Sequence, residues 1–204
     1  MAKQPKILAF AGSLRERAYT KRVLKTAVEG ARKAGAEVNV VDLNDYPMPI
    51  YNADLQAVEG FPTAVEDFQK LLLAHDGLLI ASPEYNGSLP AGLKNVIDWS
   101  SRANGDLKTA DCYRGKFAAI MTASPGGFGG IRCLGHLRDV LTILSVNVLP
   151  KEIAVTFVGG KFEGDGDEMT DEKTRSMLEN LGVSLTEMLR KAHGESVTLT
   201  SAIG

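Results

Sequence analysis

The chain has 204 residues and a mass of 21.9 kDa, which suits a single α/β domain that can bury a sizeable core without disulfides or a structural metal. Its 23 basic and 25 acidic side chains leave a formal net charge of −2, and no basic stripe of the kind that binds nucleic acid is evident. Hydrophobic residues make up 44% and charged residues 24%, which excludes a disordered, fibrous or coiled-coil chain. We therefore expect one domain over residues 1–204.

Cysteine usage and hydropathy indicate a cytoplasmic protein. Cys112 and Cys133 fit no CxxC or zinc-finger spacing, so we expect two free thiols in a reducing compartment. The longest apolar stretches are much shorter than the roughly 20 residues that span a bilayer, so no membrane association is expected. The first apolar run, residues 7–11, is too short for a secretory signal and ends at Gly12.

Short apolar segments alternate with segments of helical period along the chain. Strands are expected at residues 6–11, 37–43, 77–81, 116–122 and 146–158, the last as one strand or as two pieces broken at Pro150. Helices are expected around residues 23–31, 65–72, 90–99 and 134–144, and after residue 170. Thr63 and Glu66 have the spacing of a capping box, and Thr170 is the expected cap of the last helix.

This alternation predicts βαβ units and a parallel sheet. Five units in about 200 residues fit a flavodoxin-like, doubly wound, three-layer sandwich with a five-stranded parallel sheet of order 2-1-3-4-5. Residues 44–60 are expected to form a long loop, and long loops in compact domains are often functional. The Gly- and Asp-rich residues 159–166 are expected to form a solvated surface turn.

In an open α/β sheet, ligands bind beyond the carboxyl ends of the strands, so the segments that follow the strands carry the functional information. After the first strand, Gly12 permits a tight turn, and Ser13 and Thr20 offer hydroxyls near the start of a helix. Arg15 adds a guanidinium that suits phosphate oxygens. This pattern indicates an anion site or an ordinary strand-to-helix turn; it is neither a dinucleotide fingerprint nor a Walker loop.

The segments after the third and fourth strands suit a flat ligand. Pro83 stiffens the backbone, Tyr85 offers an apolar face, and Asn86 and Gly87 allow close approach. The alternative is a rigid surface turn. Four glycines within residues 126–130 also allow a flat ligand to approach, or they form a mobile hinge.

The residues quoted so far resemble those of a known family. Gly12-Ser13-Leu14-Arg15, the run from Pro83-Glu84-Tyr85-Asn86 through Trp99 to Arg102, and the loop at Ser124 are similar to the NADPH-dependent FMN reductase family, and within it to bacterial quinone and chromate reductases. The resemblance covers residues 6–158, and the middle run is the most specific part.

This resemblance implies bound FMN and two-electron transfer from NADH or NADPH to quinones or related acceptors such as free flavin, azo compounds or chromate. It also implies a homodimer or homotetramer. Carried over by position, Ser13, Arg15 and Thr20 would hold the phosphate, Pro83, Glu84, Tyr85 and Asn86 would border the isoalloxazine, and Ser124 would lie at its polar edge or ribityl chain. The family often has Ser and Asn where this chain has Ala18 and Thr20, so one phosphate-binding hydroxyl fewer is expected.

The expected mechanism is a ping-pong cycle in which nicotinamide gives hydride to the flavin and leaves before the acceptor binds. No catalytic side chain and no metal are expected, since His75, His136 and His193 lie in no triad or metal-binding arrangement. Glu84 would orient its loop or act as an acid. Asp98 and Arg102, four residues apart, would form a helix-surface ion pair or a subunit contact.

Two other functions stay open from sequence alone. A flavodoxin-type carrier would pass single electrons to protein partners, although a net charge of −2 provides little of the acidic docking surface such carriers use. A hydrolase or binding module without flavin is the third alternative, but the chain has no Gly-x-Ser-x-Gly elbow. The sequence does not distinguish NADH from NADPH.

Overall fold

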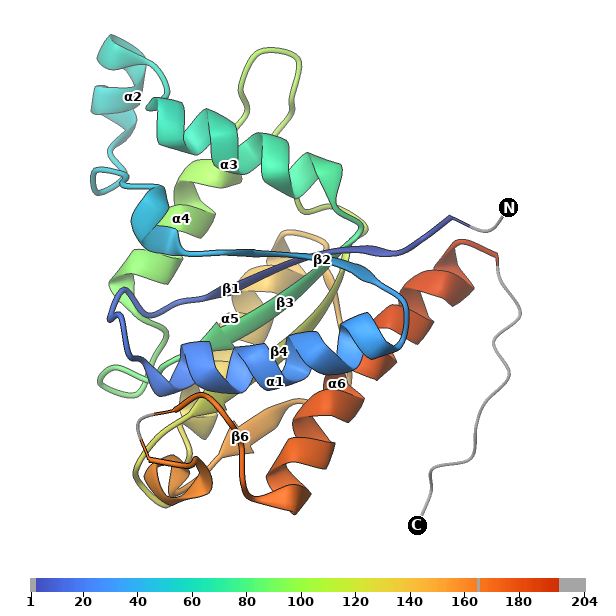
Figure 1. The fold of residues 1–204 in the computed structure, drawn as a ribbon. Helices are drawn as coiled ribbons and strands as arrows, with labels where there is room; N and C mark the ends of the chain where they lie inside the picture. The colour runs from blue at the N-terminus through green and yellow to red at the C-terminus, as the bar shows by residue number, and fades with distance from the viewer. Residues whose placement is uncertain (1–2, 165, 195–204) are drawn as a thin grey trace.

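A parallel β-sheet lies at the centre of the molecule, between two layers of helices (Figure 1). The computed structural model describes residues 3–164 and 166–194. The strands run in the order β2-β1-β3-β4-β5, with β6 also paired to β4, and every pair is parallel. The bounds are β1 Lys6–Ala11, β2 Glu37–Val41, β3 Gly77–Ser82, β4 Phe117–Ala123, β5 Asn147–Val148 and β6 Ile153–Val155. The expected flavodoxin-like order is confirmed.

The helices cover both faces of this sheet. On one face lie α1 (Tyr19–Lys33) and α6 (Glu172–Ala192). On the other lie α3 (Thr63–Ala74), α4 (Ala91–Ser100) and α5 (Ile131–Ile143). A short helix, α2 (Ala53–Glu59), and two 3₁₀ turns, η1 (Leu43–Asp45) and η2 (Val158–Lys161), complete the chain. Among the described residues, no helix is long and apolar enough to cross a membrane.

The central strands are apolar at nearly every position because both of their faces are buried. In β1, Ile7 and Ala9 pack in the cluster beneath α1 and α6, whereas Leu8 and Phe10 pack in the cluster beneath α3, α4 and α5. The unbroken apolar run that predicted this strand thus reflects two cores, one on each side of the sheet.

The fifth expected strand is divided into two short pieces. β5 pairs with the start of β4, from Phe117, and β6 pairs with its end, from Met121. Proline has no N–H to donate to a ladder, so the break falls around Pro150. The two pieces share one side of β4, and the sheet has six strands rather than five.

Two expected helix caps are wrong. Thr63 is already the first residue of α3, so Pro62 is the N-cap and no side chain caps this helix. At α6 the cap is Asp171 rather than Thr170, and its carboxylate accepts a hydrogen bond of 2.9 Å from the Thr174 N–H. Asp171 rather than Thr170 caps the helix because its side chain stands at the position from which an acceptor reaches the third helical N–H.

The segment 44–60 is more ordered than the expected loop. It contains the end of η1 and all of α2. Two side chains of α4 also form hydrogen bonds to the middle of the segment. The Pro49 carbonyl accepts hydrogen bonds from Asn95 Nδ2 at 2.9 Å and Trp99 Nε1 at 2.8 Å. Because Asn95 and Trp99 are four residues apart, one helix face presents both donors.

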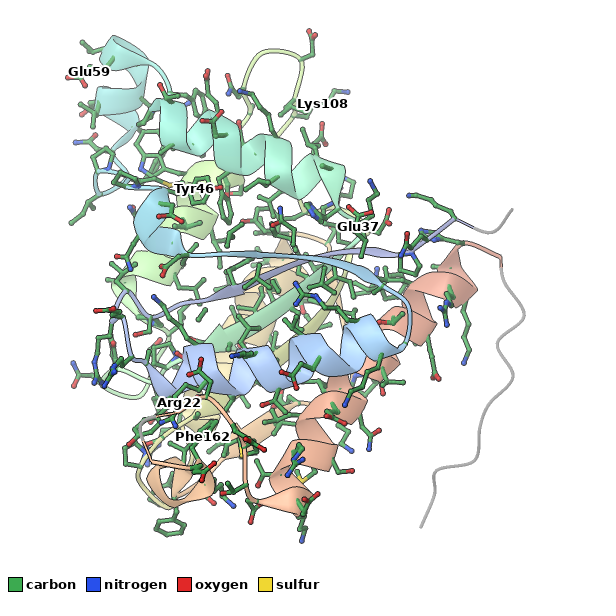
Figure 2. The ribbon with its side chains drawn as sticks, in the orientation of Figure 1. Arg22, Glu37, Tyr46, Glu59, Lys108 and Phe162 are labelled. Atoms are coloured by element: carbon green, nitrogen blue, oxygen red, sulfur yellow. The ribbon has the colours of Figure 1, made fainter. Side chains whose placement is uncertain are left out.

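Most described residues of the segment 159–166 are exposed, as expected of a surface turn, but Phe162 attaches it to the first helix. Phe162 is buried, and the Arg22 guanidinium of α1 lies 3.8 Å from the centre of its ring. Figure 2 labels both side chains. Arg22 also donates to the carbonyls of Gly164 and Gly166. This segment therefore packs against the first helix.

Candidate functional site

Three loops leave the sheet at the carboxyl ends of neighbouring strands. The first follows β1, the second follows β3, and the third follows β4. Backbone hydrogen bonds join them to the sheet: Gly12 N–H donates to Ala81 O at 2.8 Å, and Ser124 N–H donates to Val155 O at 3.1 Å. The sheet order thus brings together the segments that sequence reasoning selected, as the rule for ligand sites in open α/β sheets requires.

The first loop has the features of an anion site. Ala18 is the N-cap of α1 and supplies no side-chain acceptor, so the helix start keeps N–H groups for another partner. Ser13 and Thr20 are each 2% exposed. The Ser13 hydroxyl accepts a bond of 3.3 Å from the Arg15 N–H, but the buried Thr20 hydroxyl has no partner in the described structure. A buried hydroxyl without a partner is costly, which points to an oxygen-rich ligand at this place.

Arg15 lies at the border of this loop. Its side chain lines a hollow of about 560 Å³ beside the start of α1, together with Arg17 and Lys21. Glu16 and Asp167 also line it. Ser13 and Thr20 do not line this hollow, so it contains only one of the three expected phosphate residues.

The second loop is a tight two-residue hairpin. Tyr85 and Ser88 exchange backbone hydrogen bonds of 2.9 and 3.1 Å. Between them Asn86 and Gly87 have φ angles of +51° and +81°, the left-handed region that a type I′ turn needs at both positions and that Asn-Gly favours. Pro83 is buried at the base, and the Tyr85 ring is exposed at the tip. The aromatic face is thus presented on a rigid support.

Glu84 joins this hairpin to the third loop. Its carboxylate accepts hydrogen bonds from the backbone N–H groups of Arg132 at 2.9 Å and Cys133 at 3.3 Å, and from Arg132 Nη1 at 3.0 Å. The N-cap of α5, Gly130, has no side chain, so Glu84 caps this helix from outside. These bonds favour the orienting role over that of a free acid.

The third loop is fixed by its neighbours at several points. The Ser124 hydroxyl accepts a bond of 3.1 Å from the Gly126 N–H. Gly129 and Gly130 have φ angles of +62° and +88°, and a Cβ on Gly130 would collide with the Thr122 hydroxyl. The Phe128 ring is exposed at the loop's tip. Glycine is therefore required at these two positions by both conformation and packing.

The two cysteine thiols are not activated as nucleophiles. Burial raises the pKa of the Cys133 thiol, and burial raises that of Cys112 to about 11, so both are neutral at pH 7. Both cysteines are free, as expected. Within the described ranges, no group of three His, Cys, Asp or Glu side chains could hold a metal ion.

Of the two roles expected for Asp98 and Arg102, the ion pair is wrong, and the subunit contact stays a prediction. Asp98 pairs with Lys94 at 2.6 Å, one turn earlier on α4. Arg102 lies beyond the end of α4, and its guanidinium stands 5.3 Å from the centre of the Tyr51 ring. The helix ends between the two residues, so their spacing of four no longer places them on one helix face.

A profile of the NADPH-dependent FMN reductases matches residues 5–159. The chain belongs to the NADPH-dependent FMN reductase family. The expected class, an NAD(P)H-dependent oxidoreductase, and the expected cofactor, FMN, are confirmed at the level of this family.

Individual relatives agree with this membership. The chain is 36% identical over 195 residues to an NAD(P)H-dependent FMN reductase of Pseudomonas aeruginosa, covering 95% of this chain and 100% of that one. It is 38% identical over 172 residues to a quinone reductase of Escherichia coli, covering 84% and 86%. Among solved structures, the flavoenzyme NAD(P)H:(acceptor) oxidoreductase FerB of Paracoccus denitrificans aligns with a TM-score of 0.77 and 26% identity, over 92% of this chain and 98% of that one.

Sequence reasoning missed Arg132 and His136. Both lie on one face of α5 and bind the second loop, at Glu84 and at Ser88, where His136 Nδ1 stands 2.9 Å from the Ser88 hydroxyl. The contacts cross 48 residues of chain, and no local pattern signals them. Only the spacing of four between Arg132 and His136 hints that they share a helix face.

Proposed function

We propose that this protein is an FMN-dependent NAD(P)H oxidoreductase that transfers two electrons to quinones and related acceptors by a ping-pong mechanism. Overall, NAD(P)H, a proton and a quinone would give NAD(P)⁺ and a quinol, so both electrons of the donor are accounted for. Free flavin, azo compounds and chromate are further candidate acceptors. The names of the relatives support the quinone and flavin reactions in particular.

The residues of the three loops fit FMN. Ser13 and Thr20, with the uncapped start of α1 and the nearby Arg15, would hold the phosphate. The second loop, with Pro83, Glu84, Tyr85 and Asn86, would border the ring system, and Ser124 would lie at its polar edge or ribityl chain. FMN, when bound, supplies the electron-transfer chemistry, while this chain's residues bind and orient it.

The single observation that carries this proposal is the buried Thr20 hydroxyl. It is 2% exposed, it has no partner in the described structure, and it lies in the first turn of a helix that has no capping side chain. A phosphate at this helix start would accept its hydrogen bond and satisfy the free N–H groups at once.

Steady-state kinetics test the reaction. NAD(P)H oxidation should require an added acceptor such as a quinone, and double-reciprocal plots at several quinone concentrations should give parallel lines, as a ping-pong mechanism requires. Intersecting lines would contradict the mechanism. Negligible turnover with every small acceptor, but rapid reduction by a separate reductase, would instead favour the flavodoxin-type carrier.

We also propose that the protein is a homodimer or homotetramer in the cytoplasm. The two free, buried cysteines fit a reducing compartment. At the end of α5, Ile143 is 85% exposed beside the half-buried Val140 and Leu144, and another subunit would cover this apolar area. Light scattering coupled to gel filtration should give a mass of two or four chains; a mass near 21.9 kDa would exclude both assemblies.

A further inference from the structure

Two side chains on one face of α5 bind the second loop, one before its hairpin and one after it. Arg132 forms a hydrogen bond with Glu84, which precedes the hairpin. His136, one helical turn further along α5, is within hydrogen-bond distance of the Ser88 hydroxyl at the end of the hairpin. The contacts are 3.0 and 2.9 Å long. The hairpin that carries Tyr85 therefore depends on α5 for its orientation.

The Arg132 side chain also reaches the third loop. Its guanidinium carbon stands 4.9 Å from the centre of the Phe128 ring, a distance at which cation–π attraction is significant. Gly87 has no side chain, and a Cβ placed on it would lie 3.9 Å from the Arg132 Cδ. A single arginine thus contacts both Glu84 and the glycine loop.

The charges of this contact are unequally exposed. The Glu84 side chain is 12% exposed and that of Arg132 is 56% exposed. The carboxylate charge is thus mostly withdrawn from water, and the guanidinium is the opposite charge paired with it. Two backbone N–H groups also bind Glu84, and they would remain if the guanidinium were removed.

We propose that Arg132 is a positioning residue that fixes the Tyr85 hairpin against the glycine loop and neutralises Glu84 beside the flavin. This inference rests on the proposed function. An unpaired carboxylate there would disfavour the gain of negative charge by the cofactor on reduction, so Arg132 would keep the midpoint potential of bound FMN higher than it otherwise would be.

Four variants separate positioning from simple stabilisation. Arg132→Met removes the charge, Arg132→Lys keeps it without the planar fork, Glu84→Gln removes the opposing charge, and the fourth combines Arg132→Met with Glu84→Gln. Arg114→Met is the matched control, because Arg114 is a similarly exposed arginine in a surface ion pair, located before β4 at the other end of the sheet.

Three quantities are measured: FMN affinity, midpoint potential, and hydrogen exchange of the Tyr85 and Ser88 amides in the FMN-free chain. Arg132→Met should weaken FMN binding about fivefold to tenfold, lower the potential and speed exchange of both amides. Arg132→Lys should restore most of the potential, Glu84→Gln should raise it, and the double variant should lie near the wild type. Arg114→Met should change none of the three.

Equal behaviour of Arg132→Met and Arg114→Met would overturn the inference. So would a potential that moves in the same direction in Arg132→Met and Glu84→Gln, because loosened structure rather than charge would then explain both. If the wild type binds no FMN, the proposed function fails, while exchange of the two amides still decides whether Arg132 holds the hairpin.

Discussion

At the scale of single residues, Thr20 gives the sharpest distinction between folding and binding. Its hydroxyl is buried and bonds to nothing in the described structure, so Thr20→Val should leave the stability of the FMN-free chain unchanged or raise it by up to about 1 kcal/mol. The same change should weaken FMN binding about tenfold. Urea unfolding of the FMN-free chain and FMN titration measure the two effects, and equal losses in both would show a structural role.

Arg15 is predicted to act on the cofactor alone. Arg15→Ala should weaken FMN retention by about tenfold to a hundredfold, the usual value of a hydrogen bond to a charged group. Because Arg15 is exposed, the stability of the FMN-free chain should change by no more than about 0.5 kcal/mol. Arg114→Ala is the control, and retention equal in the two variants contradicts the phosphate assignment.

The site residues could be selected from sequence because they follow predicted strands, and their loop positions could be inferred from the strand order. Their mutual contacts could not. The role of Glu84 depends on its hydrogen bonds to α5, which begins 47 residues later. No local sequence pattern in either segment predicts these hydrogen bonds. The orphaned Thr20 hydroxyl likewise became visible only once the burial of its surroundings was known.

At the scale of elements, α1 and α6 pack backbone against backbone on the face of the sheet that they cover. A Cβ on Gly182 would collide with the backbone of Ala27, and one on Gly30 would collide with that of Glu179. Gly182→Ala should therefore destabilise the protein by about 2–4 kcal/mol, in spite of the better helix propensity of alanine.

Gly135 provides the matched control for this prediction. It is also a helical glycine, in α5, but nothing lies within 4 Å of the place of its Cβ. Gly135→Ala should stabilise the protein by about 0.5–1 kcal/mol. Urea unfolding measures both; a Gly182→Ala variant as stable as the wild type would show that the two helices are not in such close contact.

Helix caps were the least predictable part of the fold. Thr63 and Thr170 each lie one residue from the true cap, because sequence alone does not fix the first helical turn to the residue. The short helix α2 was missed because none of its residues is buried, so it has no apolar period to detect.

At the scale of the whole molecule, the cap of α6 contributes to acid stability. Hydrogen bonds from the Thr174 hydroxyl and N–H, together with Lys161, lower the pKa of Asp171 to about 2. Since the folded-state pKa lies below the ordinary value of 3.8, this stabilisation is present above about pH 4 and is lost as the pH falls toward 2.

Asp171→Asn tests this pH dependence. The amide can still accept the bond from Thr174 but does not titrate, so the wild type should lose its advantage over the variant between pH 5 and about pH 2. Urea midpoints of both proteins at several pH values give the comparison. A difference that stays constant over this range would show that Asp171 does not titrate with a lowered pKa.

The topology of the whole sheet was predictable, because long buried strands and amphipathic helices alternate through the first 123 residues. The strand prediction is less accurate after β4, because β5 and β6 together contain only five paired residues, too few for a clear periodic pattern of apolar residues. In that region the structure, and not the sequence pattern, shows that Phe162 and Gly164 contact Arg22 of α1.

The central claim is that the three loops hold one FMN that NAD(P)H reduces by two electrons. An absorption spectrum of the purified protein, followed by anaerobic titration with NAD(P)H, tests it most directly. We predict one flavin per chain, bleached by one equivalent of NAD(P)H without a long-lived radical. A colourless protein that takes up no added FMN, or a flavin that NAD(P)H leaves oxidised, would contradict it.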